Sequence, residues 1–226
     1  MTGKITYIFP SRSRPEKFFS ALDNIRDLSE SDNYEIICAL DLDDTKMNND
    51  EVKEKLRQYP NVHYYFGFSE SKVHAINREI KNISQDTKIV IIMSDDMSFI
   101  AKGHDNIIRS DMQSYFPEFN GVLHYLDGTP AADRIITMSI MGINHFKKFN
   151  YLYYPGYISV YCDNEFTEVA KKLGVYKLMG TDIYRHLHPV WGLAETDELY
   201  KRNEDPHNYD RDRELFFQRE KKNFDL

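Results

Sequence analysis

The chain has 226 residues, enough to bury one full core, and its 41% hydrophobic and 14% aromatic content is typical of an ordered globular protein. A formal net charge of −7 argues against a broad electrostatic grip on nucleic acid but leaves open an acceptor reached through a local basic patch. The only two cysteines, Cys38 and Cys162, indicate neither a disulfide framework nor a cysteine-based zinc site.

The N-terminal residues 1–4 run directly into a predicted strand and lack the apolar core of a signal peptide. No stretch reaches the roughly 20 apolar residues that are needed to span a bilayer. We therefore expect a cytoplasmic protein without an integral membrane segment.

The first hundred residues alternate strand-like and helix-like segments, a pattern that predicts βαβ units on a parallel sheet. Strands are expected at residues 5–9, 34–40, 62–66 and 89–93. The segments between them carry apolar residues at helical spacing, at 18–28, 52–56 and 73–80.

This alternation changes after about residue 103. Strands are expected at residues 121–125 and 135–141 around a turn, followed by a short helix or turn at 144–150 and a helix at 163–173. From residue 194 the chain is strongly charged, which predicts either a surface helix packed on the body or a partly mobile tail.

Asp95 and Asp96 directly follow the apolar run at 89–93. Parallel sheets bind ligands at the carboxyl ends of their strands, so two carboxylates there are well placed to hold a divalent cation and a phosphate. The same pair also suits a polar turn that caps the next helix. The local sequence leaves both interpretations open.

Polar loops follow each of the predicted parallel strands. Because these loops converge on one edge of the sheet, we expect several distant polar residues to lie close together there. They are Ser11, Arg12, Asp41, Asp43, Lys72 and Asp95.

Four segments, in this order, carry a resemblance to a known family: residues 8–15 (IFPSRSRP), 38–45 (CALDLDDT), 71–77 (SKVHAIN) and 93–96 (MSDD). They resemble the opening strand with its P-T/S-R-x-R-P loop, the second strand with its acidic end, the G-K-x-x-A-x-N helix start and the D-x-D position. The family is the glycosyltransferases of the A fold, especially the large inverting family two. The resemblance covers roughly residues 4–192.

The resemblance implies a single α/β, Rossmann-like domain with a mostly parallel central sheet. Residues 1–102 would form a nucleotide-sugar-binding half, 103–193 an acceptor-binding and catalytic half, and 194–226 a charged C-terminal helix or tail. The implied activity is a metal-dependent inverting transfer of a hexosyl or pentosyl group from a nucleotide sugar, with UDP-sugars favoured, to a hydroxyl. The acceptor stays open among a glycan, a lipid-linked sugar, a small molecule, a protein and a modified DNA base.

The departing diphosphate of a nucleotide sugar develops negative charge, which Mn²⁺ or Mg²⁺ held by hard ligands can stabilise. By resemblance, Asp95 is the first metal ligand, and Asp96 acts on the metal or on sugar hydroxyls. Asp41 would accept the N3–H of uracil, and Lys72 would meet the base or a phosphate. The donor-binding residues implied in this way are Pro10, Ser11, Arg12, Arg14, Asp41, Asp43, Lys72, Ser94 and Asp96.

Met93 departs from the family pattern, because it stands where the first Asp of D-x-D is expected. Either Asp95 and Asp96 form a displaced pair, or the chain is a nucleotide-sugar-binding protein that has lost catalysis. A nucleotidyltransferase is a further alternative, but it normally carries a Gly-rich loop after the first strand. Residues 10–15 contain no glycine, which favours the glycosyltransferase.

Residues 161–166 resemble the acidic helix start that carries the catalytic base of inverting members, which removes the proton of the acceptor hydroxyl. Asp163 is the expected base and Glu165 the reserve, although Asp163 also suits a helix N-cap and Glu165 the dipole of the first turn. His188 matches a further metal ligand of the family, with a surface histidine pair as the alternative for His186 and His188.

Aromatic residues form a second candidate feature near these positions. Trp191 and the run at 151–157 (YLYYPGY) could form an acceptor wall, since aromatic faces stack on sugars and bases, or could simply pack in the core.

Overall fold

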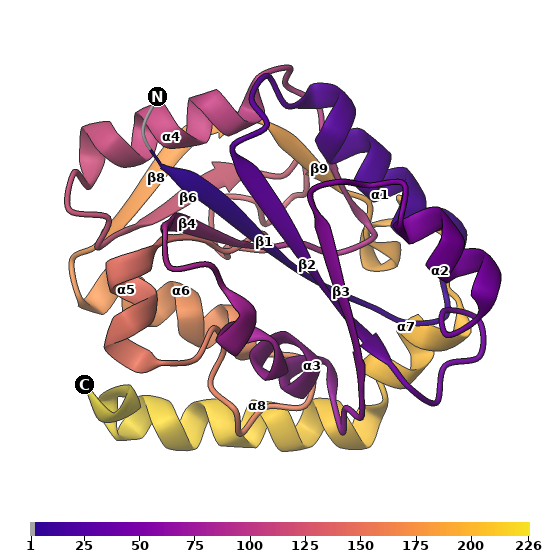
Figure 1. The fold of residues 1–226 in the computed structure, drawn as a ribbon. Helices are drawn as coiled ribbons and strands as arrows, with labels where there is room; N and C mark the ends of the chain where they lie inside the picture. Colours follow the sequence, from indigo (N-terminus) through magenta and orange to yellow (C-terminus); the bar gives the residue numbers. More distant parts are fainter. Residues whose placement is uncertain (1–2) are drawn as a thin grey trace.

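A seven-stranded sheet, with strand order β3-β2-β1-β4-β7-β6-β8, runs through the centre of the computed structural model, which describes residues 3–226 (Figure 1). Met1 and Thr2, which belong to the segment used above to argue against a signal peptide, lie outside the described residues. The strands are β1 (Lys4–Ser11), β2 (Tyr34–Asp41), β3 (Val62–Gly67), β4 (Thr87–Ile92), β6 (Val122–Leu126), β7 (Ile140–Gly142) and β8 (Tyr176–Asp182).

Strands β1 to β4 pair in parallel, whereas β7 runs antiparallel to both β4 and β6, and β8 is parallel to β6. A separate two-stranded antiparallel sheet joins β5 (Met97–Phe99) to β9 (Tyr184–His186). The sheet is therefore mostly parallel, as the sequence predicts, within one α/β domain.

Helices cover both faces of the central sheet (Figure 1). One face carries α1 (Pro15–Leu28), α2 (Asp50–Leu56) and α4 (His104–Tyr115). The other carries α3 (Lys72–Arg78), α5 (Ile143–Phe149), α6 (Cys162–Lys172) and α8 (Pro206–Lys221), while the short α7 (Glu198–Asn203) lies near the carboxyl ends of the first strands.

The sheet separates two hydrophobic cores, which explains the continuous apolar runs of the strands. In β1, Ile5, Tyr7 and Phe9 pack into one core, while Ile8 packs into the other. Successive side chains of a strand point to opposite faces, so a strand covered by helices on both sides must be apolar throughout.

The four parallel strands and the helices between them confirm the sequence prediction, but residues 135–141 do not form one strand. Only Ile140–Gly142 joins the sheet. The backbone N–H of Ile136 instead donates to Thr167 Oγ1 at 3.0 Å, and that of Met138 donates to the Tyr184 hydroxyl at 3.2 Å. Side chains thus replace a neighbouring strand as partners of this segment.

Helix α4 was not predicted, because its buried face is partly polar. Asp105 and Arg109 form a buried ion pair at 2.6 Å, and Arg109 also donates to the carbonyls of Gly3 and Asn33. The charged C-terminal region contains α7 and α8 rather than an irregular tail. Among the described residues, no helix is both long and apolar enough to cross a membrane.

Candidate functional site

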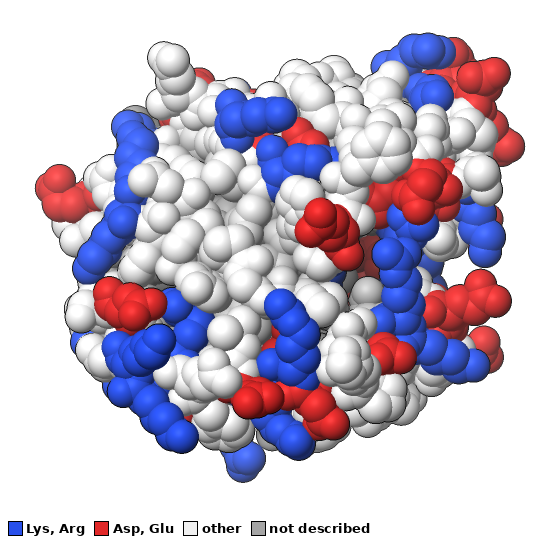
Figure 2. Space-filling view, turned by 90° about the horizontal axis from the view of Figure 1, so that it is seen from below, with Lys and Arg blue, Asp and Glu red and all other residues white. Residues whose placement is uncertain are grey.

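A cleft of about 450 Å³ opens at the carboxyl ends of β1, β2 and β4, beneath the C-terminal segment that contains α7. Most of the residues singled out in the sequence line it; Asp43 and Glu165 do not. Those that line it are Pro10, Ser11, Arg12, Arg14, Asp41, Lys72, Ser94, Asp95, Asp96, Asp163 and His188. On the face shown in Figure 2, Lys and Arg alternate with Asp and Glu instead of forming one basic stripe.

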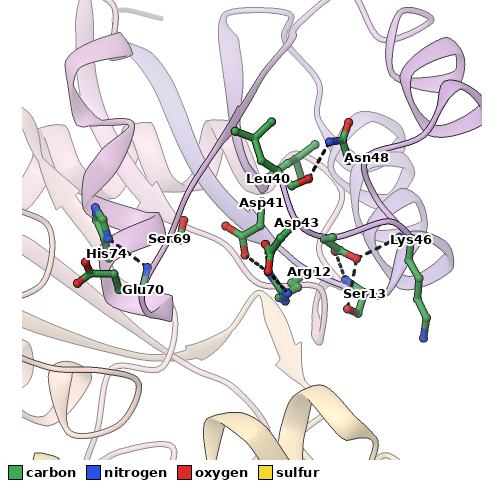
Figure 3. Close-up of polar contacts among 12 residues, drawn as sticks. Arg12, Ser13, Leu40, Asp41, Asp43, Lys46, Asn48, Ser69, Glu70 and His74 are labelled. Atoms are coloured by element: carbon green, nitrogen blue, oxygen red, sulfur yellow. Dashed lines mark hydrogen bonds and ion pairs between the residues drawn. The ribbon is translucent and has the colours of Figure 1, made fainter.

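One end of the cleft is organised by Arg12, which connects the ends of β1 and β2 (Figure 3). Its guanidinium donates to Asp41 at 2.9 Å and to both oxygens of Asp43 at 2.7 and 2.8 Å. These hydrogen bonds lower the pKa of Asp43 to about 2. Asp43 thus orients Arg12 from outside the cleft.

Two buried oxygen atoms at this end have no hydrogen-bond partner among residues 3–226: Asp41 Oδ1 and Ser11 Oγ. Arg78 Nη1 approaches Asp41 Oδ1 only to 3.7 Å. Buried polar atoms are nearly always paired, so unpaired ones that face a cleft are available to a ligand. The arrangement can accept a hydrogen bond from a flat polar group such as a nucleobase.

Asp95 is held by Arg14, which reaches across the cleft. Arg14 Nη1 donates to Asp95 at 2.9 Å, while its Nε and Nη2 donate to Asp197, the N-cap of α7, both at 2.6 Å. Burial raises the pKa of Asp95 to about 6, although the charge of Arg14 acts in the opposite direction. Arg14 therefore couples the end of β4 to the C-terminal segment.

Asp96, His186 and His188 lie close enough to hold a metal ion, since one ligand atom of each falls within 4.8 Å of the others. Asp96 Oδ2 lies 3.6 Å from His186 Nε2. Burial acts to raise the pKa of Asp96, but His186 and the hydroxyl of Ser94 outweigh it and hold that pKa below its usual range. Burial and His186 lower the pKa of His188 to about 4, so its ring is neutral at pH 7.

One carboxylate and two imidazoles fit Mn²⁺ better than Mg²⁺, which prefers oxygen ligands. The structure places Asp96, His186 and His188 close together, whereas Asp95 faces Arg14. His188 also serves as the N-cap of a short 3-10 helix, where its Nδ1 accepts from Val190 N–H at 3.4 Å.

Asp163 lines the cleft at the start of α6. It does not cap the helix: Tyr161 occupies that position with a left-handed φ of 61°. Burial raises the pKa of Asp163, and Lys72 opposes the rise. Lys72 stands at the start of α3, where Ser71 caps the helix by accepting from His74 N–H at 3.0 Å.

Lys72 carries its charge among acidic groups of the cleft. Burial acts to lower its pKa, but nearby groups that include Asp163 and Asp96 outweigh this effect and raise it. The cation and the two carboxylates therefore form one electrostatic unit.

No protein-family model and no curated protein sequence matches the chain. Solved structures do. The mannosyltransferase PcManGT from Pyrobaculum calidifontis, in complex with GDP-Man and Mn²⁺, aligns with a TM-score of 0.65 and 13% identity over 81% of this chain and 56% of that one. S. aureus TarS 1–349 in complex with UDP aligns with a TM-score of 0.63 and 16% identity over 80% and 59%. The chain has the glycosyltransferase A fold.

This chain thus spans little more than half the length of either transferase. A third structure, 4-diphosphocytidyl-2C-methyl-D-erythritol synthase from Anaerococcus prevotii, aligns with a TM-score of 0.53 and 16% identity over 78% of this chain and 86% of that one. At these identities the similarity concerns the fold alone.

Glu165 lies outside the cleft of this A-fold domain. Its carboxylate accepts from Arg219 of α8 at 2.7 and 2.8 Å and from the Tyr157 hydroxyl at 2.8 Å, all in the buried interior. The structure therefore separates the two acids at the start of α6: Asp163 faces the cleft, whereas Glu165 fastens α6 to α8.

Helix α8 also fixes the loop that leads to Asp163. The buried carboxylate of Asp212 accepts from the backbone N–H groups of Ile158, Ser159 and Val160, at 3.0, 2.9 and 3.1 Å. The burial of Asp212 was not predicted, because it lies in a strongly charged helix in which most residues are exposed.

The aromatic residues proposed as an acceptor wall divide between the cleft and the core. Trp191 lines the cleft and is 43% exposed. Tyr153 lines it too but is buried, while Tyr157 is buried against Glu165. The C-terminal segment adds lining residues that sequence reasoning missed: Tyr200, Arg202, Asn203, Glu204 and Tyr209.

Proposed function

We propose that this chain is a metal-dependent inverting glycosyltransferase that moves a sugar from a nucleotide sugar to a hydroxyl acceptor. One observation carries the proposal: the free carboxylate oxygen of Asp41, the cluster Asp96–His186–His188 and the acid Asp163 all line a single cleft. A nucleobase acceptor site, a cation site and a general base are the three elements that such a transfer needs.

The base of the donor would bind at the end formed by β1 and β2. Asp41 Oδ1 would accept the N3–H of uracil, and Ser11 Oγ offers a second polar contact. The uracil of UDP carries such an N–H donor, and the similar structure of TarS contains UDP. Lys72 and Arg14 would supply positive charge for the diphosphate.

Asp96, His186 and His188 would hold a divalent cation, with Mn²⁺ favoured by the two imidazoles. When bound, the cation stabilises the negative charge of the departing diphosphate. PcManGT, one of the similar structures, contains Mn²⁺.

Asp163 would act as the base. As the acceptor oxygen bonds to the anomeric carbon and the bond from that carbon to the diphosphate breaks, the hydroxyl proton passes to the Asp163 carboxylate. Attack from the face opposite the leaving group inverts the anomeric centre. The raised pKa of Asp163 brings this carboxylate closer to the value that suits a general base near neutral pH.

A nucleotidyltransferase is the second candidate, because the Anaerococcus prevotii synthase shares the fold. The loop that follows β1 contains no glycine in residues 10–15, which favours the glycosyltransferase.

Incubation of the protein with UDP-, GDP-, ADP- and CMP-sugars, with and without Mn²⁺, tests the proposal. We expect Mn²⁺-dependent release of UDP and free sugar from a UDP-sugar without an acceptor, measured by chromatography. UDP binding without turnover of any donor would make the chain a binding protein. Pyrophosphate release from a nucleoside triphosphate and a sugar phosphate would instead establish the nucleotidyltransferase.

A further inference from the structure

We propose that Asp127 is a positioning residue that sets which nitrogen of His186 carries the proton, so that Nε2 is free to bind the cation. The inference rests on the cation site of the proposed function but not on the sugar transfer. Asp127 does not line the cleft and would act only through His186.

The carboxylate of Asp127 is fixed in place by hydroxyl and backbone donors. Asp127 follows β6 and is 1% exposed. Its Oδ1 accepts from Thr129 N–H at 2.9 Å and from Thr129 Oγ1 at 2.7 Å, and its Oδ2 accepts from Thr137 Oγ1 at 2.7 Å. Oδ2 also lies 3.9 Å from Nδ1 of His186.

His186 is clamped between Asp127 and Asp96 by its backbone as well as its ring. Its N–H donates to the Asp127 carbonyl at 3.0 Å, and the next N–H, of Leu187, donates to the Asp96 carbonyl at 2.8 Å. The ring therefore points one nitrogen, Nδ1, at Asp127 Oδ2 and the other, Nε2, at Asp96 Oδ2, which is 3.6 Å away.

Of the two ring nitrogens of His186, Nδ1 is the one that is buried without a hydrogen-bond partner among the described residues. The distance of 3.9 Å to Asp127 exceeds a hydrogen bond, so the carboxylate acts on Nδ1 through its charge. A nearby carboxylate favours a proton on the nitrogen that faces it. Asp96 Oδ2 faces Nε2 in the same way, but a cation bound by both of these atoms would take the place of the proton there. Asp127 then keeps the one remaining ring proton on Nδ1 and leaves the lone pair of Nε2 for the cation.

This arrangement is similar to the way proteins orient metal-binding histidines, with a charge at 3.9 Å in place of a direct hydrogen bond. Such a ring usually directs its second N–H at a carboxylate or carbonyl, which fixes the tautomer and makes the ligating nitrogen more basic. Loss of the outer partner typically costs about 10-fold to 100-fold in metal affinity.

Asp127 could instead only hold the turn at residues 127–130, and the Asp127→Asn variant separates the two roles. The Asn carbonyl can still accept both hydrogen bonds from Thr129, and its amide can donate to the Thr137 hydroxyl, so the turn is kept. The amide would, however, present N–H groups to Nδ1 and favour the wrong tautomer, as the equivalent change does in a Ser-His-Asp triad.

Binding of Mn²⁺ alone, followed by the electron paramagnetic resonance signal of the free ion, tests the inference without any donor or turnover. We expect Asp127→Asn to weaken Mn²⁺ binding about 10-fold to 100-fold, with no loss of melting temperature in the ion-free protein. Asp111→Asn is the matched control. Asp111 lies on α4, outside the cleft, and accepts a hydrogen bond from the hydroxyl of Tyr125 at 2.6 Å. Tyr125 belongs to β6, the strand that Asp127 follows. The Asp111→Asn variant should bind Mn²⁺ like the wild type.

Nitrogen-15 NMR of the wild-type protein loaded with diamagnetic Cd²⁺ gives a second test that needs no variant. His186 should carry its proton on Nδ1. A proton on Nε2, or unchanged Mn²⁺ affinity in Asp127→Asn, would overturn the inference. Neither measurement depends on sugar transfer. If the protein transferred no sugar but still bound Mn²⁺ in a way that depends on Asp127, the proposed function would fail and this inference would stand.

Discussion

The two ends of the cleft are built in different ways. At the proposed donor end, Ser11 and Asp41 are the last residues of the adjacent parallel strands β1 and β2, and Arg12 directly follows β1. The contacts of Arg12 are made within the first half of the chain. At the proposed catalytic end, Asp96 lies close to His186 and His188, about 90 residues later in the chain, and Asp163 follows a loop held by α8. The first end is positioned by the sheet, whereas the second is positioned by packing between distant parts of the chain.

Acidic residues that are close together in the sequence make different contacts in the structure. Asp163 and Glu165 stand two residues apart on α6, which turns their side chains to different sides of the helix. Asp95 and Asp96 are consecutive, yet one pairs with Arg14 and the other with His186. Side-chain direction, more than position in the sequence, separates them.

The largest expected effect is at Asp163. Asp163→Asn should lower sugar transfer by about 10²-fold to 10⁴-fold, the usual contribution of a general base, while UDP binding is retained. Transfer is measured at saturating donor, and UDP binding by calorimetry. The acid limb of the wild-type pH profile should lie above the ordinary carboxyl pKa of 3.8, because burial raises the pKa of Asp163 and the base must be ionised to act.

Glu165→Gln is the matched comparison on the same helix. It breaks a buried ion pair and should cost about 3 kcal/mol of unfolding free energy in urea, but transfer per folded molecule should persist. If Glu165→Gln abolished transfer in folded protein and Asp163→Asn did not, the assignment of the base would be reversed.

The next effect separates the two adjacent acids. Asp96→Asn should weaken Mn²⁺ binding by at least about 100-fold, since a direct ligand matters more than its outer partner. Asp95→Asn should weaken it less, because Asp95 faces Arg14. Calorimetry with Mn²⁺ measures both, and a stronger loss in Asp95→Asn would restore Asp95 as the main ligand.

The smallest expected effect is at the donor end. Asp41→Asn should weaken UDP binding by about 10-fold, equivalent to one hydrogen bond to a charged group, without changing Mn²⁺ affinity. Asp44→Asn is the control, because Asp44 follows the same strand but accepts from Ser13 N–H at 2.6 Å and does not line the cleft. Equal UDP affinity in wild type and Asp41→Asn would place the base elsewhere.

Sequence reasoning predicted the four parallel strands of the first hundred residues well for a physical reason. Apolar runs that are buried on both faces are visible in the sequence, and parallel strands bring their carboxyl ends to one edge. The positions of Ser11, Asp41 and Asp95 at that edge therefore followed from their order in the chain.

The second half was harder to predict because its contacts are not periodic. In the segment at 135–139, the backbone N–H groups of Ile136 and Met138 donate to the side chains of Thr167 and Tyr184. Its apolar residues therefore have the pattern of a strand, but the segment does not pair with one. The buried face of α4 includes the ion pair Asp105–Arg109, so its sequence lacks a continuous apolar pattern. The residues next to each partner in the sequence do not indicate that such a contact will form.

The order of residues along the chain is enough to predict the mostly parallel sheet, its polar edge and the acids and histidines that are available to form a site. Packing of the folded chain brings Asp96 close to His186 and His188 and pairs Asp95 with Arg14. It also buries Glu165 against Arg219. Backbone periodicity is local and can be read along the chain, whereas the partner of a charged side chain is chosen by packing between distant elements.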